Sequence, residues 1–206
     1  MKFKNNILGF RVKGIKTFRH PWQVRALHWV LAPSVLALIA SGHYINKPSR
    51  SLGFGSMDSA RKVHFLAQYF LGYYFLARTY YGLTTGDYQK IIPGRKDLAG
   101  LPKFTAYELF MKKKKPVYPK YNPGQKILFT QLALLFPMQM VTGAILYFTG
   151  RLKYMERLFG GLNNVRLVHF LTATSLSNMV MAHIYLTLTD SVGKFKSIFT
   201  GYITPK

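Results

Sequence analysis

Cysteine is absent from this chain of 206 residues, and acidic residues are scarce, with six Asp and Glu against 29 Lys and Arg. Without cysteine the chain cannot form disulfides, thiolate-held iron–sulfur clusters or cysteine zinc sites. Any metal must therefore be held by histidine, methionine or carboxylate side chains. The first apolar run also lacks a small-residue cleavage site, so we expect that run to stay in the mature protein.

The basic excess gives a formal net charge of +23, which in a soluble protein would suggest nucleic-acid binding. In this chain 49% of the residues are hydrophobic, and the basic residues lie between the apolar blocks rather than within them. Apolar blocks separated by charged loops are typical of a membrane protein. We therefore expect the partner of this chain to be a lipid bilayer and not a nucleic acid.

Four apolar blocks are each close to the roughly twenty residues that a helix needs to cross about 30 Å of hydrocarbon. A backbone in lipid must satisfy its polar groups within its own segment, so these blocks are expected to be helices. They cover about residues 22–45, 63–83, 126–149 and 167–189. The sequence thus predicts an all-α fold, a single domain over residues 1–206 that forms an integral-membrane four-helix bundle.

Loop charge predicts how the four helices are oriented. The N-terminal segment, the second connector and the C-terminal tail together carry 21 Lys and Arg, whereas the first and third connectors carry 8. Basic loops stay in the cytoplasm, so both termini are expected on that side. The second connector holds the run Lys112–Lys115, for which we expect at most an attraction to anionic lipid headgroups. A short surface helix is expected around residues 104–113.

Five of the six histidines lie in or at the ends of the predicted helices, where an ionisable residue indicates function. His169 and His183 are fourteen residues apart on one helix, close to four turns, so they share a face at a separation of about 21 Å. Since successive helices alternate in direction, His28 matches the depth of His183, and His64 matches that of His169. Two bis-histidine pairs suit two b-type haems, because neutral imidazole is a usual iron ligand.

Other side chains compete for these roles. His43, near the outer end of the first helix, is an alternative to His64, but we expect it to cap the helix or to contact a propionate or a partner. His20 is expected to be a surface residue. Four arginines lie at helix ends, where they either meet haem propionates or reach lipid headgroups. These are Arg25, Arg61, Arg78 and Arg166.

Several short motifs together resemble a known family. They are Arg25–Trp29 and Ser41-Gly42 in the first helix, Arg61–Phe65 opening the second, and His169 through Tyr185 in the fourth. The set resembles the b-type cytochrome subunits of membrane-bound nickel–iron hydrogenases. It equally resembles the gamma subunits of respiratory formate dehydrogenases and the thiosulfate reductase cytochromes. The stretch Lys120–Lys126, followed by Thr142-Gly143, is most similar to the formate dehydrogenase subunits.

The resemblance implies that His28 and His183 hold an inner haem b, and that His64 and His169 hold an outer one. Asn122 matches a position near the quinone site at the cytoplasmic haem. With Gln125, it is our candidate for binding menaquinone or ubiquinone; the alternative is that Asn122 only caps the third helix. The implied partners are an iron–sulfur subunit and a catalytic subunit on the outer face of a bacterial or archaeal cytoplasmic membrane, and a higher oligomer of the complex is left open.

The sequence therefore predicts a membrane-anchor di-haem cytochrome b that transfers electrons between those subunits and quinone. Two other functions stay open at this point. One is a stand-alone cytochrome b561-like quinone oxidoreductase, which would need no partner subunit. The other is a haem-free membrane anchor.

Overall fold

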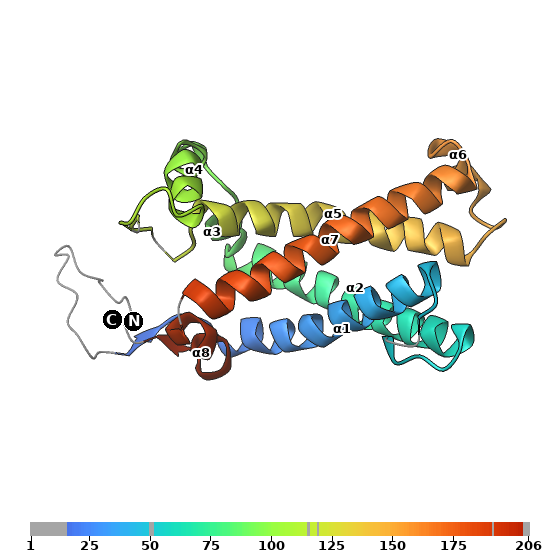
Figure 1. Ribbon diagram of the computed structural model, residues 1–206, viewed down its shortest axis with the longest axis horizontal. Coiled ribbons are helices and arrows are strands. Elements are labelled where there is room, and N and C mark those ends of the chain that lie inside the picture. The colour runs from blue at the N-terminus through green and yellow to red at the C-terminus, as the bar shows by residue number, and fades with distance from the viewer. Residues whose placement is uncertain (1–15, 50–51, 115, 119, 191, 204–206) are drawn as a thin grey trace.

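The structure, a computed structural model, describes residues 16–49, 52–114, 116–118, 120–190 and 192–203. Residues 1–15, Arg50 and Lys115, which contribute to the loop charge counted above, lie outside these ranges. Four long helices run side by side along the molecule (Figure 1). They are α1 (Trp22–Asn46), α2 (Met57–Thr85), α5 (Pro123–Tyr147) and α7 (Leu162–Asp190). Each predicted block falls on one of them, so the chain is mostly helical, as the sequence predicts.

Shorter elements gather at the two ends of the long helices (Figure 1). The helices α3, α4 and α8 lie at one end together with two strands, and α6 lies at the other. Their bounds are Tyr88–Ile91 for α3, Arg95–Glu108 for α4, Lys153–Leu158 for α6, Val192–Thr200 for α8, Thr17–Phe18 for β1 and Tyr202–Ile203 for β2. The strands pair antiparallel, a departure from the all-α prediction. A pair of two-residue strands is too short to show as an alternating pattern.

The start of α4 corrects the prediction of a helix around residues 104–113. Asp97 accepts a hydrogen bond from the backbone N–H of Gly94 at 2.8 Å, so the helix begins at Arg95. It ends at Glu108, and Phe110 follows with a φ of 60° that a helix cannot contain. Local capping therefore decides both ends, and the lysine run 112–114 lies beyond the helix.

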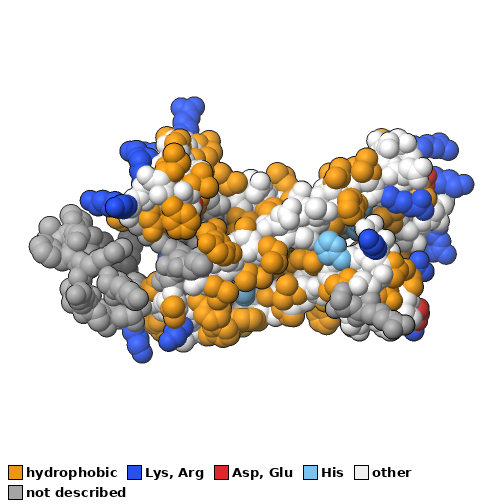
Figure 2. Space-filling model, viewed as in Figure 1, with side chains coloured by type: hydrophobic (Ala, Val, Ile, Leu, Met, Phe, Trp, Pro, Cys, Tyr) orange, Lys and Arg blue, Asp and Glu red, His pale blue; other side chains and the backbone are white. Residues whose placement is uncertain are grey.

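The long helices meet in one core cluster, to which each contributes a buried side chain. These are Val35 of α1, Leu71 of α2, Phe136 of α5 and Leu176 of α7. Elsewhere the helices expose large apolar side chains, while Lys and Arg gather toward the two ends of the molecule (Figure 2). Burying apolar surface against lipid instead of protein accounts for this distribution.

Three of the described helices, α1, α5 and α7, are long and apolar enough to cross a membrane. The chain is therefore a multi-pass membrane protein. The predicted second span corresponds to α2, which is 29 residues long but does not reach the hydropathy of the other three. Its polar residues include five tyrosines and Arg78, which all follow His64 on the same helix.

Candidate functional site

His64 of α2 and His169 of α7 face each other near the end of the molecule where α6 lies. Their ring centres are 6.5 Å apart, and the ring planes meet at 64°. A metal–imidazole bond is about 2 Å and the ring nitrogen lies about 1.1 Å from the ring centre, so two imidazoles on opposite sides of one metal have centres roughly 6.2 Å apart. The spacing of this outer pair therefore suits one metal ion between the two rings.

A buried hydroxyl contacts Nδ1 of each ring. Ser41 Oγ lies 3.0 Å from Nδ1 of His64, and Thr142 Oγ1 lies 2.8 Å from Nδ1 of His169. Each hydroxyl already donates its single proton to a helix carbonyl, Ser41 to Ala37 at 2.6 Å and Thr142 to Met138 at 2.7 Å. With its proton on the carbonyl, each hydroxyl oxygen accepts from an Nδ1–H group. In this tautomer Nε2 of both imidazoles carries no proton, as a metal ligand requires.

A glycine follows each hydroxyl residue and brings a helix backbone against the imidazole. A Cβ atom on Gly42 would lie 3.5 Å from Cε1 of His64, and one on Gly143 would lie 3.4 Å from Cε1 of His169. The outer pair is thus enclosed by the same hydroxyl–glycine pair twice, from α1 and from α5. The contact of these pairs with the histidine rings was not predicted from the sequence. The sequence signal that could have indicated this contact is the presence of a hydroxyl–glycine pair on two helices at the depth of the outer histidines.

His28 of α1 and His183 of α7 form the inner pair, at the opposite end of the long helices. They belong to α1 and α7, two helices that contact each other. His28 is half-buried, and its Nδ1 has no hydrogen-bond partner in the described part of the chain, whereas His183 is exposed. Both imidazoles are available as ligands, but no hydroxyl selects which nitrogen of His28 carries the proton. The inner pair is therefore more open and less constrained than the outer pair.

The two remaining histidines differ from each other. His43 is exposed in the last turn of α1. His20, expected on the surface, is instead half-buried. The pairing of β1 with β2 holds it beside Gly201, and the backbone N–H of His20 donates to the Gly201 carbonyl at 3.1 Å. Burial, with the neighbouring charges of Arg19 and Lys120, lowers the pKa of His20 to about 4, so this imidazole is neutral at pH 7.

Asn122 and Gln125 cap the start of α5 with their side-chain oxygens. Asn122 Oδ1 accepts from the N–H of Gln125 at 2.7 Å, and Gln125 Oε1 accepts from the N–H of Asn122 at 3.0 Å. The capping alternative therefore accounts for both oxygens. The two amide NH₂ groups donate to no residue in the described ranges, so they stay available to a ligand. Figure 1 places this turn at the same end of the molecule as the C-terminal part of α7.

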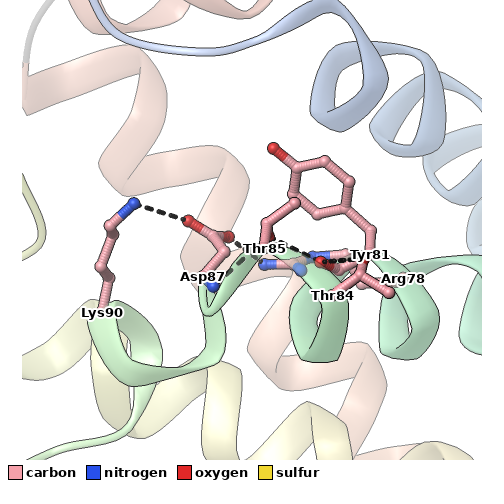
Figure 3. Close-up of polar contacts among 6 residues, drawn as sticks. All are labelled: Arg78, Tyr81, Thr84, Thr85, Asp87 and Lys90. Atoms are coloured by element: carbon pink, nitrogen blue, oxygen red, sulfur yellow. Dashed lines mark hydrogen bonds and ion pairs between the residues drawn. The ribbon is translucent and has the colours of Figure 1, made fainter. Parts of the chain in front are cut away.

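Arg78, one of the four arginines expected near propionates, is bound within the chain (Figure 3). Its Nη2 lies 2.8 Å from Oδ2 of Asp87, a carboxylate that is 6% exposed, and Lys90 Nζ approaches Oδ1 at 3.5 Å. Asp87 was not singled out in the sequence, although it directly follows Gly86, which ends α2 with a φ of 68°. The other three arginines vary: Arg25 donates to the carbonyl of Phe199, Arg166 to Asn163 Oδ1, and Arg61 is exposed.

Comparison with known proteins gives consistent matches over most of the chain. A family model described as prokaryotic cytochrome b561 matches residues 19–201. A probable Ni/Fe-hydrogenase B-type cytochrome subunit of Azotobacter vinelandii is 27% identical over 200 residues, covering 87% of this chain and 83% of that protein. The protein of the same description from Bradyrhizobium diazoefficiens is 26% identical over 203 residues, covering 88% and 81%.

Proposed function

The chain belongs to the prokaryotic cytochrome b561 family, and from this premise we propose that it is a di-haem cytochrome b subunit that transfers electrons between an outer-side partner and membrane quinone. The observation that carries the proposal is the 6.5 Å spacing of the His64 and His169 rings, with both Nδ1 atoms bound by hydroxyls. That geometry suits a bis-histidine haem and has no evident purpose in a haem-free anchor.

We assign His64 and His169 to the outer haem b and His28 and His183 to the inner one. Haem iron, when bound, gains and loses single electrons, which the side chains of this chain cannot do by themselves. The helices supply the position and the orientation of the four imidazoles. Because His169 and His183 share α7, their separation is set by one rigid element at about 21 Å along its axis.

The core cluster lies between the two histidine pairs. Leu176 is seven residues from both His169 and His183, and Val35 and Leu71 are each seven residues beyond a histidine, His28 and His64 respectively. Seven residues correspond to about 10 Å of helix, so the cluster occupies the middle depth. These apolar side chains exclude water from the region between the two pairs. They also hold all four helices in one register.

We propose that α2 is the fourth membrane span. It carries His64, packs along α1 and contributes Leu71 to the common core, so it shares the environment of the other three helices. Residues 1–206 then form a single domain with both termini in the cytoplasm. The loop charge supports that orientation, as does the pairing of β1 with β2 at one end of the molecule.

Quinone is proposed to bind at the cytoplasmic end, beside the start of α5. The free amide NH₂ groups of Asn122 and Gln125 can donate to a quinone carbonyl oxygen. An apolar groove runs beside the same part of α5 and suits the hydrocarbon tail of menaquinone or ubiquinone. It is lined by Ile91, Ile92, Phe129, Thr130, Ala133 and Leu134.

The similar proteins are named as hydrogenase subunits, which suggests the kind of complex that this chain joins. We propose a catalytic subunit on the outer face, coupled through an iron–sulfur subunit. The chain has no cysteine, so any iron–sulfur cluster must come from such a partner. The outer histidine pair, close to α6 and the loop between α1 and α2, lies nearest to that face.

The test is a count of haem per chain in the purified protein and in four single variants. The wild type should contain two haems with b-type pyridine-haemochrome spectra. His64→Ala and His169→Ala should each lose one and the same haem, and His28→Ala and His183→Ala should each lose the other. One haem per chain in well-folded wild type would rule out the paired arrangement, and no haem at all would end the proposal.

A further inference from the structure

The two histidine pairs differ in what surrounds Nδ1. Both outer imidazoles contact a hydroxyl, and both hydroxyl residues, Ser41 and Thr142, are fully buried. Within the described ranges, no hydrogen bond reaches a ring nitrogen of His28 or His183. The helices α1 and α5 therefore each supply a hydroxyl contact to an imidazole of the outer pair, and the inner pair has no such contact in the described ranges.

We propose that Ser41 and Thr142 are positioning residues that hold the outer ligands in one tautomer and lower the reduction potential of the outer haem below that of the inner haem. The inference rests on the proposed function, because it takes His64 and His169 as the ligands of the outer haem. It adds a role for two residues that contact neither iron nor substrate. It also sets a preferred direction of electron flow.

Each hydroxyl is a stronger acceptor than a free serine or threonine side chain. Its proton is engaged by a helix carbonyl at 2.6 or 2.7 Å, which polarises the oxygen and strengthens the next hydrogen bond in the chain. The Nδ1–H group that donates to this oxygen becomes more negative, and the opposite nitrogen becomes a more basic ligand. A more basic ligand stabilises the oxidised, more positively charged iron, so the reduction potential falls.

The neighbouring glycines keep this hydrogen bond in place. Gly42 and Gly143 bring the backbone against Cε1 of each ring, at 3.5 and 3.4 Å from an added Cβ position. Each imidazole is held between a hydroxyl on one atom and a helix backbone on the next. The hydroxyl and the backbone contact adjacent atoms of the ring, so the tautomer and the orientation are set together.

The asymmetry has a functional consequence. If the outer haem has the lower potential, electrons move downhill from the outer haem toward the cytoplasmic one, where the quinone is proposed to bind. The reaction class on the outer side is then an oxidation whose electrons reduce quinone. A partner that takes electrons from quinol to reduce an outer substrate would have to move them uphill within this subunit.

The experiment is a potentiometric titration of the detergent-purified full chain with both haems bound, followed by optical spectroscopy. Ser41→Ala and Thr142→Val, the second of which keeps the side-chain shape, should each raise the midpoint potential of the outer haem. The potential of the inner haem should stay at its wild-type value in both. The double variant should shift the outer haem further than either single variant.

The matched control is Ser34 of α1, whose hydroxyl donates only to the helix carbonyl of Val30, at 2.6 Å. Ser34→Ala should leave both potentials unchanged. Thr142→Ser retains the hydroxyl in a smaller side chain and should keep the wild-type potential. A rise in Thr142→Ser as large as that in Thr142→Val would assign the effect to packing and overturn the inference.

The outcomes separate this inference from the proposed function. Unchanged potentials in Ser41→Ala and Thr142→Val, with both haems retained, would overturn the tuning role and leave the ligand assignment intact. Retention of both haems in His64→Ala would instead overturn the assignment itself. If Thr142→Val loses the outer haem, Thr142→Ser decides: a retained haem at wild-type potential supports the hydroxyl, and its loss overturns the inference.

Discussion

Replacing Gly42 should show whether the backbone of α1 fixes the position of the His64 ring or only lies near it. Gly42 lies in α1, directly after Ser41, and a Cβ atom there would meet Cε1 of His64 at 3.5 Å and Nδ1 at 3.8 Å. These are ordinary van der Waals distances, so Gly42→Ala should fit. Alanine also favours the helix over glycine by about 1 kcal/mol. The alanine variant should therefore keep both haems.

Valine at the same position should not fit. Each γ-carbon lies about 1.5 Å from Cβ, so a methyl directed at His64 would approach the imidazole inside contact distance. Overpacking of this kind costs typically about 1–3 kcal/mol. If the cost is relieved by displacing His64, binding of the outer haem should weaken by roughly 5- to 150-fold. The inner haem should be unaffected, since its histidines lie at the other end of the molecule.

The assay is the loss of haem to a soluble haem-scavenging protein, monitored at the absorbance bands of the two haems. Gly72→Val in α2 is the matched control, because a Cβ atom there meets only the terminal Cε of Met140 at 3.6 Å, a flexible group that can move. Retention of the outer haem by Gly42→Val as tightly as by wild type would show that Gly42 does not position His64. Release of that haem from Gly72→Val as fast as from Gly42→Val would show that the effect is not specific to the contact with His64.

Three further predictions address other parts of the chain. His43→Ala should retain both haems with bis-histidine spectra, and loss of the outer haem alone would show that His43 is the ligand. Asn122→Ala should keep haem content and haem reduction by the partner but lower quinone turnover; if turnover and apparent quinone affinity are both unchanged, the quinone site lies elsewhere. The hydrogen bond from Lys126 at 2.8 Å, and then that from the backbone N–H of Gly94, lower the pKa of Asp97. The ion pair between Asp97 and Lys126 therefore stabilises the attachment of α4 to α5 fully at a pH above the ordinary carboxyl pKa of about 4. This stabilisation is lost as the pH falls through the lowered pKa of Asp97. Proteolysis within α4 should therefore increase at low pH in wild type and already at neutral pH in Asp97→Asn, and equal cleavage of the two proteins at neutral pH would show that another contact holds α4.

The long helices were predictable because their signal is local. Blocks of apolar residues near the length of a membrane crossing point to helices whatever their neighbours are. The limits of α4 were predicted wrongly, since they depend on how Asp97 caps the backbone of Gly94 and on the left-handed conformation of Phe110. The pairing of β1 with β2 joins residues 184 to 186 positions apart, and no local pattern indicates it.

In the candidate site, too, some features follow from the local sequence and others only from tertiary packing. Periodicity along α7 places His169 and His183 on one face, so the sequence predicts two depths for ligands. It leaves His43 and His64 as rivals at the outer depth, because both lie near the same end of adjacent helices. The packing of α2 on α1 and of α7 on α5 brings the His64 ring to 6.5 Å from that of His169, while His43 stays exposed.

The sequence by itself therefore determined that this is a helical membrane protein with histidines at two depths and charge confined to its ends. These properties follow from composition and from the 3.6-residue period, which act along the chain. Only the tertiary structure decided which imidazoles face each other and which hydroxyls bind them. Ser41 and Thr142 belong to different helices from the histidines that they contact, and a hydrogen bond between helices depends on how those helices pack rather than on the spacing of residues within either one.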